Sequence, residues 1–391
     1  MAAESAREFE ALEAQAATLL DRFRRAGYEQ VAPSILQPAD IFLDEIGEQL
    51  RSRTYVFTDL AGEELCLRPD LTVPVSRLYL ERHPDALVEA RYCYNGPAFR
   101  FQPGSASGPH PREFRQAGIE CFGVKDRDAA DLEVVLLAVE AVREAGLKAF
   151  RLRFGDIALF YALLDALDLP KRWRLKLRHY FWRPSAFHAL LSRLAKGERP
   201  KDNGPVAALA AMLEGQNSER AEELVAAYLD ANALPLSGNR GLGEIAARLA
   251  DHAADLRADP LPKEVATVID YYLAIEAPPK EAADRIAMIA RGAGLDLGPA
   301  LHAHVRRFER LAASGVDLAT AAFATEFGRS LEYYSGLVFQ IETAGRAETT
   351  QVAGGGRYDG LLTRLGAPQE VPAIGSAIHT ERLLAAAKGV A

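Results

Sequence analysis

The sequence has few of the residues from which covalent cross-links and metal sites are built. It contains three cysteines and eight histidines in 391 residues. The cysteines, Cys66, Cys93 and Cys121, lie far apart, each within an apolar run, and no CxxC spacing occurs. We therefore expect buried free thiols in a reducing compartment rather than disulfides or zinc ligands.

Long apolar segments are also missing. The apolar run 132–142 is interrupted by Glu133 and Glu140, and no uncharged stretch approaches the roughly 20 residues that a membrane span requires. The first ten residues, MAAESAREFE, have neither the basic nor the apolar segment of a signal peptide. The sequence therefore predicts a cytoplasmic protein without a membrane segment.

An excess of basic residues is absent as well. The chain has 46 Lys and Arg against 54 Asp and Glu, which gives a net charge of −8. Phosphate binding needs a basic surface, so this balance argues against a protein whose main role is to hold nucleic acid. Hydrophobic residues make up 49% of the chain, enough for a substantial core, and its length predicts two or three structural units.

Several motifs for catalysis and cofactor binding do not occur, among them GxxxxGK[ST], HExxH, GxSxG and the EF-hand loop. His302 and His304 fall in a helical context, where residues two apart point in different directions, so no metal site is expected there. The three glycines 354–356 are not a dinucleotide fingerprint, because Asp359 stands where that motif has glycine. They form either a tight turn or a backbone that a ligand approaches closely.

Regular structure is predicted toward the N-terminus. Residues 5–26 have apolar side chains at helical spacing and are followed by Gly27, a common helix stop. Residues 54–68 resemble a hairpin with its turn at 59–62. Two aromatic-rich β segments flank the Gly/Ser/Pro loop 103–111, which we expect to close over a ligand.

The character of the sequence changes along the chain. Residues 130–325 are dominated by Ala, Leu, Glu and Arg in amphipathic helical patterns, and β-like segments return after Phe327. One sheet contributed by both ends, with a helical insertion between them, explains this order. We predict an α+β fold in which residues 1–150 and 323–391 form a discontinuous core and residues 151–322 form a mainly helical insertion.

Polar side chains gather on the predicted strands. Gln116, Gly118 and Glu120 share one face at a spacing of two, which is either a solvent-facing surface or the floor of a polar pocket. Arg100 lies between two aromatic residues, where it is either an exposed edge or an anion clamp. Asp70 stands just before a helix, a position where Asp commonly caps the N-terminus.

The segment EFGRSLEYYSGLVFQIE combines an apolar strand with a polar cluster before it. Strict alternation would send Arg329 and Tyr334 to opposite faces. For both to reach one ligand, the strand must begin late, near Leu331, or bend at Gly328. We predict that Arg329 lies in the entering loop, while Tyr333 and Tyr334 lie on the strand.

Together these segments resemble the catalytic core of class II aminoacyl-tRNA synthetases, and among these the histidyl enzyme. The three class II motifs are similar to GYEQVAPSILQPADIF with Pro33, to YNGPAFRFQPG with PREFRQAGIECFG, and to IGSAIHTERLL with Arg382. The histidine-specific signatures RPEGT and RGLDYYNRTVFE are present as RPDLT and RSLEYYSGLVFQ, and AGGRYDGL is present as AGGGRYDGL. The matches run in order through residues 27–123 and 327–384. The resemblance implies an antiparallel sheet flanked by helices.

The resemblance implies a histidine-binding pocket built by nine side chains: Asp70, Thr72, Arg100, Gln116, Glu120, Arg329, Tyr333, Tyr334 and Tyr358. Asp70, Thr72 and Gln116 would hold the α-ammonium group. Glu120 and Tyr334 would lie at the two ring nitrogens, since an imidazole needs a donor and an acceptor on opposite edges.

The remaining side chains of this set would close the pocket. Arg329 and Arg100 would meet the carboxylate of the amino acid. Tyr333 would line the pocket, and Tyr358 would form a wall together with the backbone of residues 354–356.

The sequence departs from the family at the nucleotide site. Gln102 replaces a Glu that meets the adenine, and His379 replaces a Gly, so a ring occupies a place where the nucleotide needs bare backbone. Arg100 and Arg382, the phosphate-binding pair of the family, are retained. We interpret Gln102, His379 and Arg382 as an eroded nucleotide site. Nine residues follow Arg382, so we expect no anticodon-binding domain and no tRNA partner.

A retained amino-acid pocket beside an eroded nucleotide site resembles the regulatory subunit of the short-form ATP phosphoribosyltransferase, which begins histidine biosynthesis. In that family a synthetase-like homodimer joins a short catalytic subunit in a hetero-oligomer, activates it and passes on feedback inhibition by histidine. The physical basis is linkage, because a ligand that favours one state of the complex shifts the partner's equilibrium. The resemblance implies a non-catalytic cytoplasmic subunit that needs neither a cofactor nor a metal.

Two other functions stay open. The first is a histidyl-tRNA synthetase-like enzyme that activates an amino acid with ATP, since Arg100 and Arg382 are retained. The second is a binding module for another amino acid, since Asp70 and Leu71 replace Glu and Gly of the family signature. Histidine-dependent ATP–pyrophosphate exchange separates the enzyme from the regulator.

Overall fold

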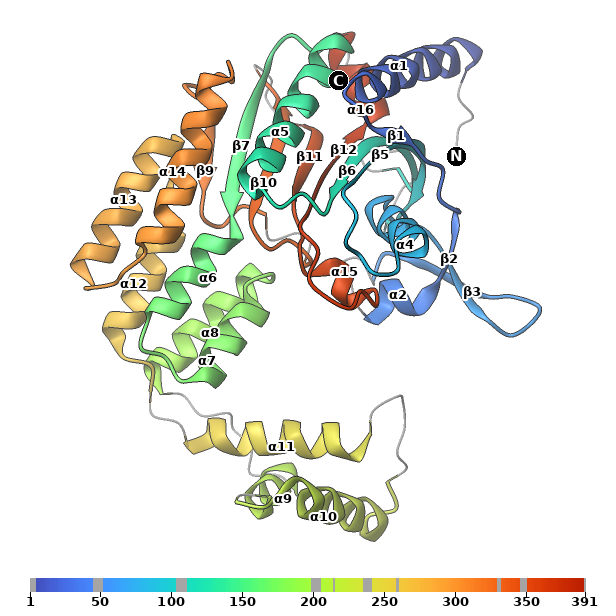
Figure 1. Cartoon of the computed structure of the whole chain (residues 1–391). Helices are drawn as coiled ribbons and strands as arrows, with labels where there is room; N and C mark the ends of the chain where they lie inside the picture. Colours follow the sequence, from blue (N-terminus) through green and yellow to red (C-terminus); the bar gives the residue numbers. More distant parts are fainter. Residues whose placement is uncertain are drawn as a thin grey trace. The chain divides into compact units, whose positions relative to one another are not determined.

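The structure, a computed structural model, describes residues 5–44, 52–102, 111–197, 205–213, 215–234, 241–257, 260–328, 332–344 and 350–389. Internal contacts divide the chain into two units (Figure 1). The first contains Met1–Leu167 together with Tyr271–Ala391, and the second contains Asp168–Asp270.

The first unit is built on a nine-stranded sheet to which both ends of the chain contribute. Its strands are β1 (Glu29–Gln30), β5 (Ala90–Phe99), β6 (Glu113–Phe122), β7 (Phe150–Asp156), β8 (Glu276–Ala277), β9 (Ala322–Ala324), β10 (Leu337–Thr343), β11 (Gln351–Arg357) and β12 (Ala373–His379). Their order is β1-β5-β6-β12-β11-β10-β7-β9-β8. The six central strands from β5 to β7 pair antiparallel, whereas β1 and β9 join their neighbours β5 and β7 in parallel. The predicted α+β fold with an antiparallel sheet is confirmed.

A small second sheet contains the predicted hairpin. It is formed by β2 (Leu36–Pro38), β3 (Tyr55–Thr58) and β4 (Glu64–Leu67), in the order β2-β4-β3. The hairpin turns where Gly62 adopts φ +87 and Asp59 Oδ1 accepts hydrogen bonds from the N–H groups of Ala61 and Glu63, at 2.8 and 2.9 Å. The carboxylate thereby satisfies the turn's own backbone donors.

Helices cover both faces of the nine-stranded sheet. In this unit they are α1 (Ala6–Arg25), α2 (Ala39–Asp44), α4 (Thr72–Arg82), α5 (Arg127–Glu144), α6 (Ile157–Ala166), α13 (Pro279–Gly292), α14 (Gly298–Ala313), α15 (Leu361–Arg364) and α16 (Thr380–Ala387). On one face α1 packs against α5 and α16, which in turn pack on β11 and β12 (Figure 1). On the other face Tyr79 of α4 stacks on Phe122 of β6, with the ring centres 4.7 Å apart.

The predicted first helix is confirmed as α1. It begins with a reciprocal capping box between Ser5 and Glu8, and it ends before Gly27, which has φ +89. Its buried residues include Leu12, Leu19 and Phe23, which recur at helical spacing and face the rest of the unit.

The second unit is helical throughout its described residues. It contains α7 (Lys171–Tyr180), α8 (Pro184–Lys196), α9 (Pro205–Met212), α10 (Ser218–Ala231) and α11 (Leu242–Arg257), while α12 (Lys263–Leu273) leads back to the first unit. The predicted insertion, 151–322, is longer than this unit. Residues 151–167 and 271–322 supply β7, β8, β9, α13 and α14, which complete the large sheet and its cover. The division into a discontinuous core of 1–150 and 323–391 and an insertion of 151–322 stays a prediction.

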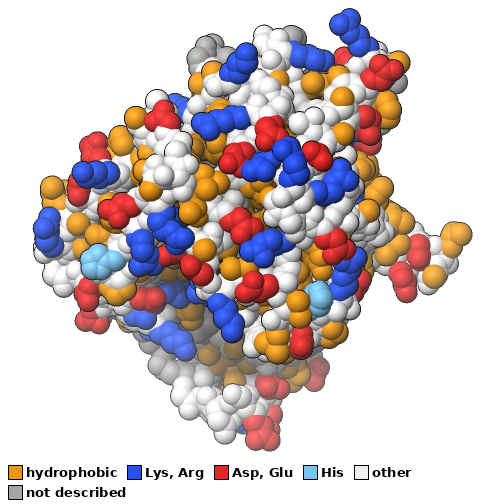
Figure 2. Space-filling model, turned by 45° about the horizontal axis from the view of Figure 1, so that its top comes forward, with side chains coloured by type: hydrophobic (Ala, Val, Ile, Leu, Met, Phe, Trp, Pro, Cys, Tyr) orange, Lys and Arg blue, Asp and Glu red, His pale blue; other side chains and the backbone are white. Residues whose placement is uncertain are grey.

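Charged side chains of both signs are mixed on the surface. On the face shown in Figure 2, Lys and Arg side chains lie among Asp and Glu side chains rather than in a separate basic area. None of the helices in the described part of the chain has the length and apolarity needed to cross a bilayer.

A buried ionic network ties the helices of the first unit to its sheet. Arg357, at the end of β11, donates from Nε and Nη2 to Asp131 Oδ1 of α5 at 2.9 and 2.6 Å, and from Nη1 to Asp359 at 2.8 Å. The other oxygen of Asp131 lies 2.9 Å from Arg307 Nε of α14, and Arg307 Nη1 donates to Asp156 at 2.7 Å. All five side chains are buried, so the charges compensate one another away from water.

Replacing the shared carboxylate tests how much this network stabilises the fold. Asp131→Asn leaves Arg307 and Arg357 without their common anion in a buried place, so we expect a loss of about 3–5 kcal/mol in the free energy of unfolding, measured by chemical denaturation. The control is Glu281→Gln, which removes the exposed ion pair with Arg285 and should cost less than about 1 kcal/mol. Equal losses in the two variants would contradict the prediction.

Candidate functional site

The central sheet presents a row of small residues on one face. Directly paired residues of antiparallel strands point to the same side, and the register pairs β6 with β12 and β12 with β11. The sheet floor that results consists of five residues: Gly118, Gly354, Gly356, Gly375 and Ala377. Gln116, Glu120 and His379 share this face and border the floor. The predicted common face of Gln116, Gly118 and Glu120 is therefore confirmed, and Gln116 and Glu120 are buried.

The three glycines 354–356 lie within β11, so the interpretation as a tight turn is wrong. Side chains at these positions would clash with neighbouring side chains that approach the backbone closely. A Cβ on Gly355 would lie 2.8 Å from the ring of Phe339, and one on Gly356 would lie 2.9 Å from the ring of Tyr334. The missing side chain at Gly356 lets Tyr334 lie over the sheet floor. The approach of a ligand to this backbone stays a prediction.

Glu120 is fully buried at the edge of the sheet floor. Its Oε1 accepts a hydrogen bond from the Tyr94 hydroxyl at 3.0 Å, and its Oε2 accepts one from the Tyr358 hydroxyl. The hydroxyl of Thr72 is a third hydrogen-bond partner. A Cβ on Gly375 would overlap the carboxylate, so glycine is required opposite Glu120.

The surroundings of Glu120 favour its neutral form. Burial raises its pKa to about 8, and the nearby carboxylate of Asp70 acts in the same direction. The hydroxyls of Tyr358, Thr72 and Tyr94 lower the pKa but do not outweigh burial. Charged forms are strongly disfavoured in a buried site without a counter-ion, so a proton stays on this group near neutral pH.

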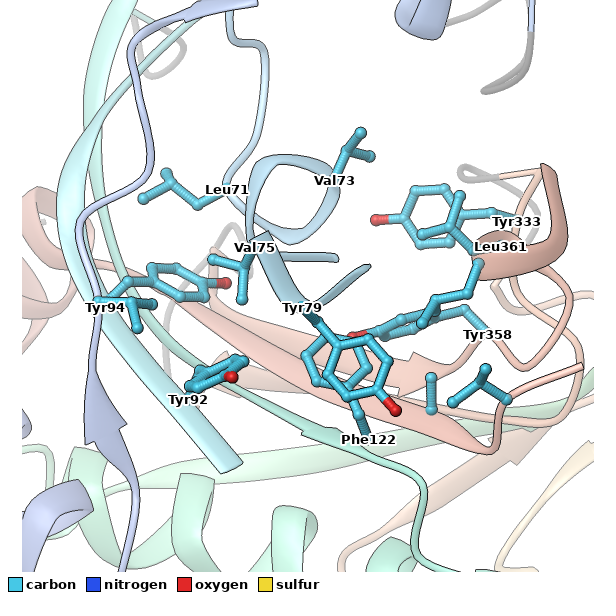
Figure 3. Close-up of a cluster of buried hydrophobic side chains, with 14 of the residues drawn as sticks. Leu71, Val73, Val75, Tyr79, Tyr92, Tyr94, Phe122, Tyr333, Tyr358 and Leu361 are labelled. Carbon is cyan, nitrogen blue, oxygen red and sulfur yellow. The ribbon is translucent and has the colours of Figure 1, made fainter. Parts of the chain in front are cut away.

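Tyr94 is a site residue that the sequence reasoning missed. It stands opposite Gly118 in the β5–β6 register, and a Cβ on Gly118 would lie 2.5 Å from Tyr94 Cζ. The phenol thus crosses the position that a side chain at 118 would occupy and reaches Glu120. In Figure 3, Tyr94 and Tyr358 direct their hydroxyls inward from opposite sides of the buried cluster. An aromatic residue paired with a glycine is the signal that could have found it.

Asp70 and Thr72 are positioned where β4 leads into α4. Asp70 Oδ1 accepts a hydrogen bond from the Val73 N–H at 3.2 Å, although Leu71 occupies the N-cap position itself. Asp70 Oδ2 and Gln116 Oε1 are both buried and have no hydrogen-bond partner among the described atoms. Buried acceptors without a donor are rare, so each of these two oxygens is a candidate partner for a ligand that donates hydrogen bonds.

The segment before β10 differs from the prediction. The sequence predicts Tyr333 and Tyr334 on the strand, but β10 starts only at Leu337, so that prediction is wrong. Of the two alternatives, a late start near Leu331 or a bend at Gly328, the strand starts late, even later than Leu331, and Gly328 has a φ of +97. Arg329, predicted in the entering loop, lies outside the described residues.

Hydrogen bonds explain the late start of β10. The Ser335 N–H donates to the Arg357 carbonyl at 2.7 Å, and the Ser335 hydroxyl accepts from the Asp359 N–H at 3.0 Å. These bonds tie the segment to the end of β11 outside the regular ladder. Tyr333 then packs edge-on against Tyr334 and Tyr358, with the ring centres 5.1 and 5.8 Å apart.

Two residues assigned to the family's nucleotide site, Arg100 and His379, lie against Phe114. Arg100 Nε donates to the Pro69 carbonyl at 2.8 Å, and its guanidinium lies 5.1 Å from the centre of the Phe114 ring. The ring of His379, at the end of β12, lies 5.3 Å from the same ring. Phe114 is therefore in contact with both a cation and an imidazole.

The other two residues of this group make different contacts. Gln102 Oε1 accepts a hydrogen bond from Arg53 at 3.2 Å. Arg382 of α16 donates to the Gln351 carbonyl at 3.2 Å. Burial, and next to it the positive charge of Arg100, lowers the pKa of Arg382. This end of the site is therefore positively charged.

Most of the predicted pocket residues act on one another electrostatically. The pKa of Asp70 is raised by burial, and the positive charge of Arg100 opposes that rise. Burial also raises the pKa values of Tyr333 and Tyr334, and both phenols feel the charges of Asp70, Glu120 and Arg100. The structure thus brings an acidic, tyrosine-rich group of side chains and a group of arginines close enough to act on one another.

Residues with other possible roles lie elsewhere. In the described part of the chain, no group of three or more His, Cys, Asp or Glu side chains is arranged to hold a metal ion. His304 is buried between Phe308 and Phe323, and burial lowers its pKa to about 4. The cysteines are buried and free, as predicted.

Known proteins match nearly the whole chain. Residues 4–267 and 273–383 match the protein family described as Histidyl-tRNA synthetase. The ATP phosphoribosyltransferase regulatory subunit of Agrobacterium fabrum strain C58 is 37% identical over 375 residues, which cover 95% of this chain and 96% of that protein. The protein of the same name from Brucella anthropi is 36% identical over 356 residues, covering 91% and 92%.

A solved structure has the same fold. The crystal structure of an ATP phosphoribosyltransferase regulatory subunit/histidyl-tRNA synthetase from Bacillus halodurans C aligns with a TM-score of 0.66. The alignment covers 99% of this chain and 81% of that chain at 18% identity, a level that speaks for the fold alone. The predicted class II synthetase-like fold is confirmed.

The raised pKa of Glu120 predicts how stability depends on pH. Between pH 4.5 and about 8, the folded chain holds a proton on Glu120 that the unfolded chain has released. The contribution of this group to the free energy of unfolding therefore falls as pH rises across that range, by about 1.4 kcal/mol for each step of one in pH. We expect denaturant unfolding at pH 5, 6.5 and 8 to show this loss in the wild type and not in Glu120→Gln. Parallel pH curves for the two proteins would contradict it.

Proposed function

Because this chain belongs to the family of ATP phosphoribosyltransferase regulatory subunits, which has the histidyl-tRNA synthetase-like fold, we propose that it binds free histidine and uses that binding to regulate a short-form catalytic subunit. In this proposal the chain performs no catalysis itself. It forms a homodimer that associates with the catalytic subunit in a hetero-oligomer, activates it, and inhibits it when histidine is abundant.

The observation that carries the proposal is the pair of buried acceptors without donors. Asp70 Oδ2 and Gln116 Oε1 have no partner among the described atoms, although both are out of contact with water. The α-ammonium group of an amino acid supplies three N–H donors and a positive charge. Such a group would satisfy both acceptors and neutralise Asp70, which explains why the pocket tolerates them.

The acidic, tyrosine-rich group suits an imidazole side chain. Glu120 offers a carboxyl group and Tyr334 offers a phenol that lies over Gly356. Tyr333 and Tyr358 add apolar ring surface beside them. A ring with one nitrogen donor and one nitrogen acceptor can use both kinds of group at once. Arg100, and Arg329 as the sequence predicts, would meet the carboxylate of the same ligand.

The arginine-rich end supports a regulatory role over a catalytic one. The ring of His379 lies against Phe114, and Gln102 accepts a hydrogen bond from Arg53. In the synthetases these two positions carry Gly and Glu, so the surface offered to a nucleotide is altered at both. We infer that the chain no longer activates its amino acid with ATP.

Binding can regulate a partner only if the partner prefers one state of this chain. A ligand shifts an equilibrium by no more than its difference in affinity between the two states. The predicted pocket draws on the start of α4, on strands β6 and β11, and on the segment 332–336. A ligand that satisfies Asp70 and Gln116 would fix these segments relative to one another, and a catalytic subunit bound to them would sense that change.

The histidine site is tested by isothermal titration calorimetry of the chain together with a short-form catalytic subunit. Gln116→Ala and Asp70→Asn each remove one of the buried acceptors for the ammonium group. We expect each to weaken histidine binding by about 1.5–3 kcal/mol, or roughly tenfold to a hundredfold, as for hydrogen bonds to charged groups. Asp59→Asn, in the exposed hairpin turn, is the matched control and should bind as the wild type does. Absence of histidine binding to the wild-type complex would overturn the sensor role.

The retained Arg100 and Arg382 are compatible with one rival function, which is activation of an amino acid with ATP. The two guanidiniums are close enough for Arg100 to lower the pKa of Arg382, as a phosphate-binding pair requires. Under our proposal, the purified chain shows no histidine-dependent ATP–pyrophosphate exchange above background. Sustained exchange would favour the enzyme instead, and loss of that exchange in Arg382→Ala would assign it to this site.

A further inference from the structure

Glu120 has hydroxyl neighbours from several elements but no positive neighbour among the described groups that act on it. Strand β5 contributes Tyr94, the start of α4 contributes Thr72, and the chain after β11 contributes Tyr358. Strand β12 contributes only the backbone of Gly375. The segment before β10 contributes two more phenols, Tyr333 and Tyr334, which feel the charge of Glu120.

The charged side chain that acts on Glu120 is a second acid, Asp70. Asp70 opposes ionisation of Glu120, while Asp70 itself is compensated by Arg100 and Arg68. Among the described groups, positive charge therefore acts on Asp70, while Glu120 has only hydroxyls and a second carboxylate acting on it. If Glu120 were ionised, it would be a buried anion whose hydrogen-bond partners among the described residues are neutral hydroxyls. The carboxylate of Asp70 would add a repulsive charge. That arrangement is costly unless a proton or a cation accompanies Glu120.

We propose that Glu120 and the ring of the bound histidine hold one exchangeable proton between them, and that Glu120 carries this proton while the pocket is empty. The inference rests on the proposed function, because it requires a ligand with a weakly basic ring at this end of the site. The complex then contains either a carboxyl group that donates to a ring nitrogen or an imidazolium that donates to a carboxylate. Both arrangements contain the same number of protons.

The number of protons in the complex determines how many protons the solvent supplies or accepts when histidine binds. Near neutral pH the empty pocket holds the proton and the free ring is mostly uncharged, so binding exchanges none with solvent. In more acidic solution the free ring already carries a proton, so one proton must leave to the buffer on binding. In more alkaline solution Glu120 has lost its proton, so binding must take one up from the buffer.

Because Glu120 is buried, the proton uptake on binding should begin at a pH at which histidine binding can still be measured. Its pKa of about 8 lies well above that of an exposed carboxyl group. Above that value the apparent affinity for histidine should fall toward tenfold for each unit of pH, because the pocket must be protonated before it binds. An exposed carboxyl group at this place would give no such dependence between pH 7 and 8.5.

The test is calorimetric titration with histidine at pH 6, 7 and 8.5 in two buffers of different ionisation enthalpy, using the full chain with its catalytic partner. For the wild type we expect uptake of roughly one proton per bound histidine at pH 8.5 and none at pH 7. Glu120→Gln cannot carry the proton, so its uptake at pH 8.5 should fall to the small fraction that the ligand's own α-amino group takes up on binding as an ammonium. Tyr94→Phe removes a hydroxyl that favours the ionised form, so its uptake should begin at higher pH.

Tyr79→Phe is the matched control, because Tyr79 is a buried phenol of the same cluster whose hydroxyl donates to the Val88 carbonyl instead. It should leave the pH of onset unchanged. Histidine binding without proton uptake at pH 8.5 overturns this inference and leaves the sensor role intact. Uptake in Glu120→Gln that equals the wild-type uptake also overturns it. Absence of histidine binding at every pH overturns the proposed function, and the inference falls with it.

Discussion

The burial of one carboxyl group beside the sheet floor is the constraint on which the rest of the site depends. Glu120 can stay there only because Gly375 leaves room opposite it and because hydroxyls reach it from three separate parts of the chain. The Tyr94 hydroxyl in turn requires a glycine at 118, because a side chain there would occupy the place of the Tyr94 ring. A single buried polar group thus fixes the residue type at several positions distant in sequence, as buried polar networks do when every member must be satisfied.

The parts of the molecule that the sequence predicted are those fixed by local patterns. Helix α1 follows from its apolar spacing and from Gly27 at its end, and the hairpin at 54–68 follows from its turn residues. The resemblance added the order of the motifs and hence the class of fold. The shared face of Gln116 and Glu120 needed only the period of a strand, because that period is two wherever a strand forms.

The parts that the sequence did not predict depend on neighbours brought together by folding. Tyr94 becomes a site residue through its register with Gly118, which a single strand cannot reveal. The late start of β10 depends on Ser335 bonding to the end of β11. The role of the glycines of β11 was ambiguous in the sequence, because a residue without a side chain suits both a tight turn and a strand face with close neighbours. In each case a contact between segments far apart in sequence decided the outcome.

The end of β11 takes part in two sets of buried bonds at adjacent positions. Arg357 belongs to the ionic network with Asp131 and Arg307, while the next residue, Tyr358, bonds to Glu120. Arg307 also holds Asp156, whose other oxygen caps α6, the last helix before the chain enters the second unit. A short series of buried bonds therefore anchors both the pocket's tyrosine and the departure point of the insertion. A substitution on α14 that disturbs Arg307 would therefore affect both the position of Tyr358 in the pocket and the point where the chain enters the second unit.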